Sequence, residues 1–177
     1  MSHLDGTNVS EYAFVPPAEV FEPHDVSEIQ QIALAHNVAG SRPLRVVSTG
    51  YNWGLGSASS TSSDTDLISL NKLSSIRAID EDLGYAVIDA GVTQEQLTQA
   101  LHANASTRYL NCTASSALTS VVGNMMDRGV GLHGQRTDDL LGLEVVLPDG
   151  TIGTVGWWPG SGSLAANRWG LGPSSLH

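Results

Sequence analysis

A cluster of glycines follows a short, mainly apolar segment near residue 44 of this 177-residue chain. The segment Leu44–Val47 predicts a strand, and Gly50, Gly54 and Gly56 come soon after it. Glycines at this spacing let the backbone turn sharply and point successive N–H groups into one concavity, a shape that binds phosphate. The cluster has neither the Gly-Lys-Ser/Thr ending of a Walker motif nor the Gly-x-Gly-x-x-Gly spacing of dinucleotide folds. From these glycines alone, a phosphate site and an ordinary surface turn stay equally open.

A second glycine cluster occupies residues 123–131 and contains Gly123, Gly129 and Gly131. It follows a run of small residues that extends from Thr113 to Ser120. Few side chains fill the space around such a segment, which indicates a chain that passes close to a flat or bulky group. Together the two clusters could enclose a dinucleotide.

Five motifs in this order resemble the FAD-binding domain of the p-cresol methylhydroxylase and vanillyl-alcohol oxidase family. They are Ser-Thr-Gly-x-Asn-x-Gly-x-Gly-Ser at 48–57, Asp-Ala-Gly-Val-Thr at 89–93, Gly-Asn-x-Met-Asp-Arg-Gly-Val-Gly at 123–131, Leu-Glu-Val-Val-Leu-Pro-Asp-Gly at 143–150 and Trp-Gly-Leu-Gly-Pro at 169–173. The resemblance extends from about Val20 to Pro173, which is nearly the whole chain. The motif at 123–131 is its most specific part.

The resemblance implies an α+β fold in which FAD lies extended between two small α/β lobes. We expect an N-terminal arm at 1–17 and a PCMH-type FAD-binding domain at 18–177, with lobe one ending near Leu73 and lobe two at 74–177. In the family, a further segment completes the FAD domain, and a cap domain supplies most of the substrate pocket. The resemblance therefore implies a C-terminally incomplete domain, either the N-terminal part of an enzyme or one chain of a split one.

The charge of the chain limits its partners. Asp and Glu number 18 against 8 Lys and Arg, for a net charge of -10, which argues against binding to nucleic acid or to an anionic membrane. A nest of backbone N–H groups can still bind a dinucleotide, because it does not depend on net charge. The single cysteine, Cys112, cannot form an internal disulfide, and the start of the chain lacks signal-peptide features. We therefore expect a cytoplasmic protein.

Hydrophobic patterning and turn residues predict the local elements. Asp25 or Ser27 could cap the first helix, Thr93 and Gln96 form a capping box at the start of the second, and Asp149-Gly150 marks a hairpin turn. The expected strands are 19–21, 44–48, 66–69, 76–79, 85–90, 141–147 and 151–155, and the expected helices are 27–38, 94–103, a piece near 118–126 and a turn at 164–169.

Candidate cofactor-binding residues lie in both glycine clusters and in the small-residue run. Those of the first cluster, expected at the pyrophosphate, are Ser48, Thr49, Gly50, Tyr51, Asn52, Trp53, Gly54, Leu55, Gly56 and Ser57. Those that the resemblance implies along the flavin and the ribityl chain are Ser115, Ser116, Gly123, Asn124, Asp127, Arg128, Gly129 and Gly131.

Some of these residues have alternative structural roles. Tyr51 and Trp53 could be surface or core aromatics, and Asp127 with Arg128 could form a local ion pair. Thr113, Ser115 and Ser116 could belong to a loop without a cofactor contact.

Departures from the family motifs bear on the chemistry. Members that oxidise 4-alkylphenols carry a tyrosine directly after Gly-Val-Gly, where this chain has Leu132, which argues against a phenolic substrate. Some members carry an acidic residue at the position of Ser115. The positions that tether flavin in the related berberine-bridge group correspond to Tyr51 and Ser116, so non-covalent FAD is expected. His133 is kept as an alternative tether or catalyst, against the more frequent case of a solvated histidine.

The sequence thus favours the FAD-binding portion of an oxidoreductase that acts on an alcohol or an activated C–H bond. Its expected partners are FAD, a small-molecule substrate, and a complementing C-terminal chain or a second copy of the chain. The alternative is a non-catalytic binding or assembly module derived from such a domain. No residue is assigned to catalysis, and the six histidines show no metal-ligand spacing, so no metal site is expected. Trp157 and Trp158 could form a packing patch or a face that meets the missing half.

Overall fold

A computed structural model describes residues 13–51 and 59–159. Their contacts group into two compact units, each of which combines separate stretches of sequence. Unit 1 contains the described residues up to 24 and from 42 to 137, and unit 2 contains those from 25 to 41 and from 138 onward. This grouping differs from two consecutive lobes, because the first helix packs with the last hairpin. The predicted lobe boundary near Leu73 stays a prediction.

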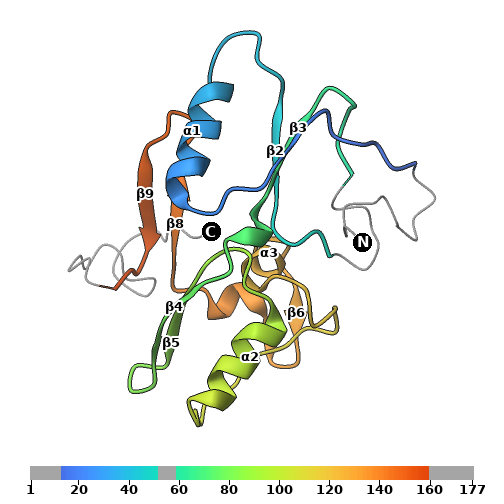
Figure 1. Cartoon of the computed structure of the whole chain (residues 1–177). Coiled ribbons are helices and arrows are strands. Elements are labelled where there is room, and N and C mark those ends of the chain that lie inside the picture. The colour runs from blue at the N-terminus through green and yellow to red at the C-terminus, as the bar shows by residue number, and fades with distance from the viewer. Residues whose placement is uncertain (1–12, 52–58, 160–177) are drawn as a thin grey trace. The chain divides into compact units, whose positions relative to one another are not determined.

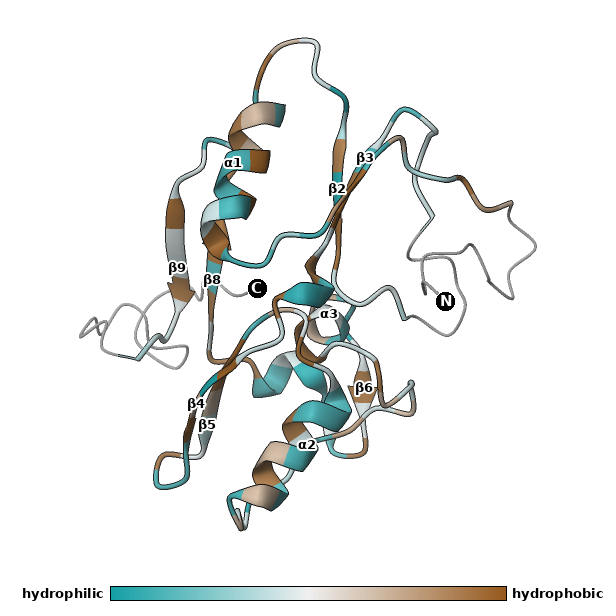
Figure 2. Ribbon diagram, in the orientation of Figure 1, coloured by the Kyte–Doolittle hydropathy of each residue, from teal (hydrophilic) through white to brown (hydrophobic). Residues whose placement is uncertain are grey.

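Unit 1 is built on a small parallel sheet in the order β1-β3-β2, with β1 at Val20–Phe21, β2 at Leu44–Val47 and β3 at Asp66–Ser69. Figure 1 shows β2 and β3 side by side, and both strands carry apolar residues, coloured brown in Figure 2. All four residues of the central strand β3 are buried, as expected for a parallel strand flanked on both sides. The Nε of Arg42 pairs with the buried carboxylate of Asp66 at 2.9 Å.

The rest of unit 1 consists of short elements around one apolar core. They are a 3-10 helix at Leu70–Lys72, β4 at Ile76–Asp80, β5 at Tyr85–Ile88, α2 at Gln94–Ala103, α3 at Val121–Met126, β6 at Val130–Gly131, β7 at Gly134–Gln135, and the first two residues of a 3-10 helix at Arg136–Asp139. The buried apolar residues are Val47, Leu67, Ile68, Leu73, Val92, Leu97, Leu101, Val121 and Met125. The core therefore combines residues of the parallel sheet with residues of α2 and α3.

Unit 2 consists of α1 at Val26–His36 and an antiparallel hairpin of β8 at Gly142–Val146 and β9 at Ile152–Gly156. Asp25 caps α1, since its side chain accepts from the Glu28 N–H at 2.9 Å. Gly150 adopts a φ of 76° in the hairpin turn. Its carbonyl accepts from Nε2 of Gln30 at 2.7 Å, which fastens α1 to the hairpin. Figure 1 shows α1 beside β8 and β9.

The local predictions agree with these elements to within a few residues. The capping box of α2 is confirmed: Thr93 Oγ1 accepts from the Gln96 N–H at 3.2 Å, and Gln96 Oε1 accepts from the Thr93 N–H at 2.9 Å. The small β6–β7 hairpin was not predicted, because strands of two residues leave no alternation to detect. Residues 1–12 of the predicted arm and the predicted helical turn at 164–169 lie outside the described residues.

Gly123 lies where α3 meets the end of β2. A Cβ added there would overlap the hydroxyl of Ser48. We expect Gly123→Ala to lower the free energy of unfolding by about 1–3 kcal/mol, the usual cost of overpacking. The double variant Ser48→Ala/Gly123→Ala should recover part of this loss, because the overlapping oxygen is gone. Urea unfolding of the apoprotein measures both effects, and equal stability of Gly123→Ala and wild type would contradict the contact.

Glu81 fastens the β4–β5 turn to the segment after α2. Its carboxylate accepts from Ser106 Oγ at 2.6 Å, and from the Thr107 N–H and Thr107 Oγ1 at 3.0 Å each. These hydrogen bonds, first that of Ser106 and then that of the Thr107 backbone, lower the pKa of Glu81. The depressed pKa stabilises the fold above the unfolded value of about 4.3, and this contribution is lost as the pH falls through the folded pKa.

Glu81→Gln should therefore lower the Tm at neutral pH, and the Tm difference from wild type should shrink steadily as the pH falls below about 4.3. Thermal unfolding monitored by circular dichroism over a pH series measures the difference. Asp82→Asn, which removes an exposed carboxylate of the same turn, is the matched control. A difference that does not depend on pH would show that the carboxylate charge does not carry the effect.

Candidate functional site

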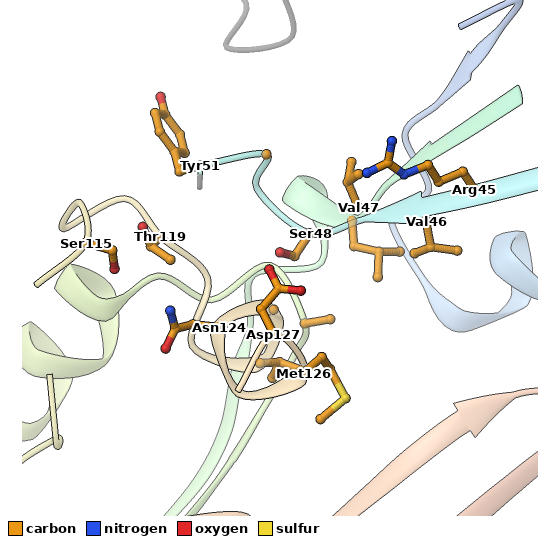
Figure 3. A pocket seen from close by; sticks show the side chains of 15 residues that line it. Arg45, Val46, Val47, Ser48, Tyr51, Ser115, Thr119, Asn124, Met126 and Asp127 are labelled. Atoms are coloured by element: carbon orange, nitrogen blue, oxygen red, sulfur yellow. The ribbon is translucent and has the colours of Figure 1, made fainter. Parts of the chain in front are cut away.

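A pocket of about 310 Å³ lies within unit 1 where the end of β2, the loop before α3 and α3 itself converge. Figure 3 shows the side chains that line it, with Ser48 from the end of β2, Ser115 and Thr119 from the loop, Asn124 from α3, and Asp127 from the C-terminal end of this helix. The fifteen lining residues are Arg45, Val46, Val47, Ser48, Gly50, Tyr51, Leu70, Ala90, Ser115, Thr119, Val122, Gly123, Asn124, Met126 and Asp127.

The first wall is the turn that follows β2. Gly50 adopts a φ of 76°, so the backbone turns with positive φ directly after the strand, as the glycine pattern predicted. Ser48 and Gly50 line the pocket. Thr49 between them is buried, and its Oγ1 accepts from the Ser120 N–H at 3.1 Å. Thr49 therefore joins this wall to the start of α3.

The second wall is α3, which Ser120 caps by accepting the Gly123 N–H at 2.8 Å. Asn124 lines the pocket, and its Oδ1 is buried without a hydrogen-bond partner in the described structure. Asp127 also lines the pocket and is exposed, as is Arg128, which has a φ of 54°. The structure shows no ion pair between these two described residues, so the predicted local pair is not formed.

The third wall is the loop from Thr113 to Thr119, which packs against the start of α2. The Gln94 N–H donates to the Thr119 carbonyl at 3.0 Å, and the Thr119 N–H donates to the Ser116 carbonyl at 2.9 Å. Thr119 is buried, with an exposed fraction of 5%. Thr119 lines the pocket, and its buried Oγ1 has no hydrogen-bond partner within the described residues.

The ionisable side chains among the fifteen lining residues are those of Arg45, Tyr51 and Asp127. Histidine and cysteine are not among them. His133, the predicted alternative tether or catalyst, is outside the lining set. Its ring centroid lies 5.9 Å from that of Tyr109, and its backbone N–H donates to Asn111 Oδ1 at 3.1 Å. The described part of the pocket is thus shaped for binding and offers few groups for proton transfer.

The structure brings seven of the predicted cofactor residues together in this pocket. These are Ser48, Gly50, Tyr51, Ser115, Gly123, Asn124 and Asp127. The predicted residues that are described but do not line it are Thr49, Ser116, Arg128, Gly129 and Gly131. The remaining candidates, Asn52, Trp53, Gly54, Leu55, Gly56 and Ser57, lie outside the described residues. The assignment of all these residues to FAD stays a prediction.

Sequence reasoning missed eight lining residues, which are Arg45, Val46, Val47, Leu70, Ala90, Thr119, Val122 and Met126. Most are apolar residues of strands and helices, which read in a sequence as ordinary core. Thr119 carried a partial signal, because it belongs to the small-residue run before the second glycine cluster.

Close packing within the protein accounts for the glycines of the second cluster. A Cβ on Gly129 would overlap the side chain of Asn124, and a Cβ on Gly131 would overlap that of Asn111. The Gly129 N–H also donates to the Asn124 carbonyl at 2.8 Å. The sequence analysis explained the glycines of this cluster by a close approach of the chain to a bound group. Close packing against neighbouring side chains of the protein is a second reason for them.

The described residues present neither a candidate metal site nor a candidate membrane span. Within residues 13–51 and 59–159, His, Cys, Asp and Glu form no group of three or more that could hold a metal ion. In the same part of the chain, no helix has both the length and the apolar character that a membrane span requires.

Comparison with known proteins places this arrangement in a family. The model of the FAD binding domain matches residues 17–156. The 1'-carboxy-chondrochloren decarboxylase of Chondromyces crocatus is 37% identical over 161 residues, which cover 87% of this chain and 29% of that protein. The 4-cresol dehydrogenase [hydroxylating] flavoprotein subunit of Pseudomonas putida is 36% identical over 136 residues, which cover 75% of this chain and 26% of that protein.

A solved structure agrees with these two relatives. The crystal structure of p-cresol methylhydroxylase with substrate bound superimposes with a TM-score of 0.84 and 31% identity, over 98% of this chain and 34% of that one. This chain thus spans about a third or less of the length of the proteins that it matches. Because the family model covers most of the sequence and the fold is the same, the chain belongs to the FAD-binding domain family and resembles p-cresol methylhydroxylase.

Proposed function

We propose that this chain holds FAD in the unit 1 pocket as the flavin-binding portion of an oxidoreductase. The observation that carries the proposal is a pair of buried oxygen atoms, Thr119 Oγ1 and Asn124 Oδ1, which belong to two residues that line the same pocket. Both atoms lack hydrogen-bond partners in the described structure. A buried oxygen without a partner costs about 1–3 kcal/mol, and a polar ligand in the pocket would remove this cost.

The residues present suit FAD in chemistry and in size. Thr119 can donate or accept a hydrogen bond, whereas Asn124 Oδ1 can only accept one. FAD offers both donors, in its hydroxyl and ring N–H groups, and acceptors, in its carbonyl and phosphoryl oxygens. A volume of about 310 Å³ is at the lower end for small-molecule sites, so the pocket would hold one portion of an extended dinucleotide. The remaining portion would extend along residues beyond the lining set.

When bound, FAD would supply the redox chemistry by accepting electrons from an alcohol or an activated C–H bond. The part of this chain would be to bind the cofactor without a covalent link and to shield one side of it with apolar residues such as Val47 and Met126. Substrate positioning would require further protein, supplied by a longer chain, a complementing chain or a second copy. The length of the relatives supports this view, since the chain covers only 29% of one and 26% of another.

The substrate is an alcohol or an activated C–H compound other than a 4-alkylphenol. Leu132 supports this choice, because it cannot provide the hydroxyl that a phenolic substrate would meet at the same position. Leu132 is 85% exposed in the β6–β7 hairpin, so it is available to contact a substrate or another protein segment. The two relatives are a decarboxylase and a hydroxylating dehydrogenase by name, so they do not identify one common reaction.

A second candidate function is a binding module without turnover. The composition of the lining supports it, because Asp127 is the one carboxylate among the fifteen lining residues and histidine is not among them. The two candidates differ in whether the bound flavin can be reduced by a substrate once the remaining protein is supplied.

Thr119→Val tests the site in the proposed function. Valine has nearly the shape of threonine but lacks the hydroxyl, so the apoprotein should be as stable as wild type or slightly more stable. We expect the Kd for FAD, measured by fluorescence titration, to rise about three- to tenfold, which corresponds to the loss of one hydrogen bond. Thr98→Val, on α2 and outside the lining set, is the control. Equal FAD affinity in wild type and Thr119→Val would remove Thr119 from the site.

Anaerobic flavin bleaching tests turnover. We expect the isolated chain loaded with FAD to keep its flavin absorbance in the presence of alcohols and 4-alkylphenols, because the protein that would position a substrate beside the flavin is not supplied. Sodium dithionite, which reduces flavin without a protein site, is the positive control. Bleaching that appears when a complementing C-terminal segment is added supports the enzyme over the binding module. Rapid bleaching by the isolated chain would show instead that its own residues form a complete active site.

A further inference from the structure

Gln94, the first residue of α2, is the centre of a buried hydrogen-bond network behind the pocket loop. Its Oε1 accepts from the Thr113 N–H at 3.0 Å and from Nη1 of Arg136 at 2.9 Å. Its Nε2 donates to the Ser115 hydroxyl at 3.1 Å and to the Ser116 carbonyl at 3.1 Å. One buried amide thus fixes three residues of the loop.

The partners of Gln94 determine which way its amide group points. The Thr113 N–H and the Arg136 guanidinium can only donate, so they require the oxygen of the amide on their side. The Ser116 carbonyl can only accept, so it requires the nitrogen on the other side. The Ser115 hydroxyl therefore faces an N–H group and must accept from it.

The Thr113 hydroxyl adds a second donor to Ser115. Thr113 Oγ1 lies 2.7 Å from Ser115 Oγ and 3.4 Å from Oε1 of Gln94. The lone pairs of this Oε1 are already used by the Thr113 N–H and Arg136, so the nearer Ser115 oxygen is the better acceptor for the Thr113 proton. Ser115 Oγ then accepts two hydrogen bonds, and its own proton is left to point toward the pocket that Ser115 lines.

We propose that Ser115 is committed as a hydrogen-bond donor to an acceptor atom of the bound FAD, and that Gln94 is the positioning residue that sets this polarity. The inference rests on the proposed function and adds the direction of one hydrogen bond to it. The acceptor is an oxygen or an unprotonated ring nitrogen of FAD. A ligand that presents an N–H group at this point would meet the Ser115 proton and be disfavoured.

Arg136 keeps the network in place. Its side chain is completely buried, and its backbone N–H donates to the Gly129 carbonyl at 2.8 Å. Arg136 thereby links Gln94 to the chain that follows α3. The positive charge of Arg136 also favours the orientation of the Gln94 amide in which Oε1, and not Nε2, faces the guanidinium group.

The first variant removes the donor itself. Ser115→Ala should raise the Kd for FAD about three- to tenfold, the cost of one neutral hydrogen bond, and should also lower apoprotein stability, because one N–H of the buried Gln94 amide loses its acceptor. FAD fluorescence titration measures the Kd, and urea unfolding measures the stability. Ser74→Ala removes a half-buried hydroxyl of unit 1 outside the lining set and should leave the Kd unchanged.

The second variant reverses the polarity. In Gln94→Glu, a carboxylate oxygen replaces the Nε2 donor, so the Ser115 proton should turn inward, away from FAD. Gln94→Glu should therefore weaken FAD binding as much as Ser115→Ala or more. In the double variant Ser115→Ala/Gln94→Glu, the second substitution should reduce FAD affinity by less than it does in the wild-type background. The reason is that the hydrogen bond from Ser115 to FAD is already absent. A purely structural role of Gln94 predicts additive losses instead.

The outcomes separate this inference from the proposed function. Both the proposed function and this inference are supported if three results occur together. Wild type binds FAD, Ser115→Ala binds FAD more weakly, and the loss of FAD affinity in the double variant is smaller than the sum of the two single losses. Wild type that binds FAD while Ser115→Ala binds equally well overturns the donor role and leaves the proposed function standing. Strictly additive losses overturn the positioning role of Gln94. Wild type that does not bind FAD overturns the proposed function, and the inference fails with it. If Gln94→Glu does not fold, Ser115→Ala alone decides the donor role.

Discussion

The pocket depends on the hydrogen bonds of one buried residue, Ser120. Its N–H donates to Thr49 Oγ1 at 3.1 Å, at the end of the parallel sheet. Its hydroxyl donates to the Ala90 carbonyl at 2.6 Å and accepts the Gly123 N–H at 2.8 Å, which joins the turn before α2 to the start of α3. Three segments distant in sequence are thus fixed at one point, and the walls of the pocket follow from their directions. An apolar residue at this position would leave several buried polar groups without partners.

The pocket combines a rigid frame with a few unsatisfied polar atoms. The frame consists of hydrogen bonds made by Ser120 and by Gln94, and those of Gln94 engage the Thr113 N–H and the Ser115 hydroxyl of the loop before α3. Thr119 Oγ1 and Asn124 Oδ1 are two of several buried side-chain atoms without a hydrogen-bond partner in the described residues, and they are the two that belong to pocket-lining residues. A preformed site that keeps a small number of polar atoms for its ligand is typical of cofactor binding.

The glycines of the second cluster illustrate how a correct motif can have more than one physical cause. Sequence reasoning attributed them to a nearby cofactor, since small side chains leave room for one. In the structure, Gly123 accommodates Ser48, and Gly129 accommodates Asn124. Both of these neighbours line the pocket. The glycines thus act on the site indirectly, by allowing polar side chains to reach it, and this role adds to any direct contact with FAD.

The sequence by itself determined the local elements and the family. Alternating apolar residues, the capping box at Thr93 and the Asp149-Gly150 turn depend on neighbours within a few positions, so they can be read without a fold. The family motifs likewise record backbone shapes that only certain residues adopt. Only the tertiary structure decided which polar atoms are satisfied and which are left for a ligand. Thr119 reads as one more small residue in the sequence, and its hydroxyl becomes distinctive only because packing buries it at the pocket without a protein partner.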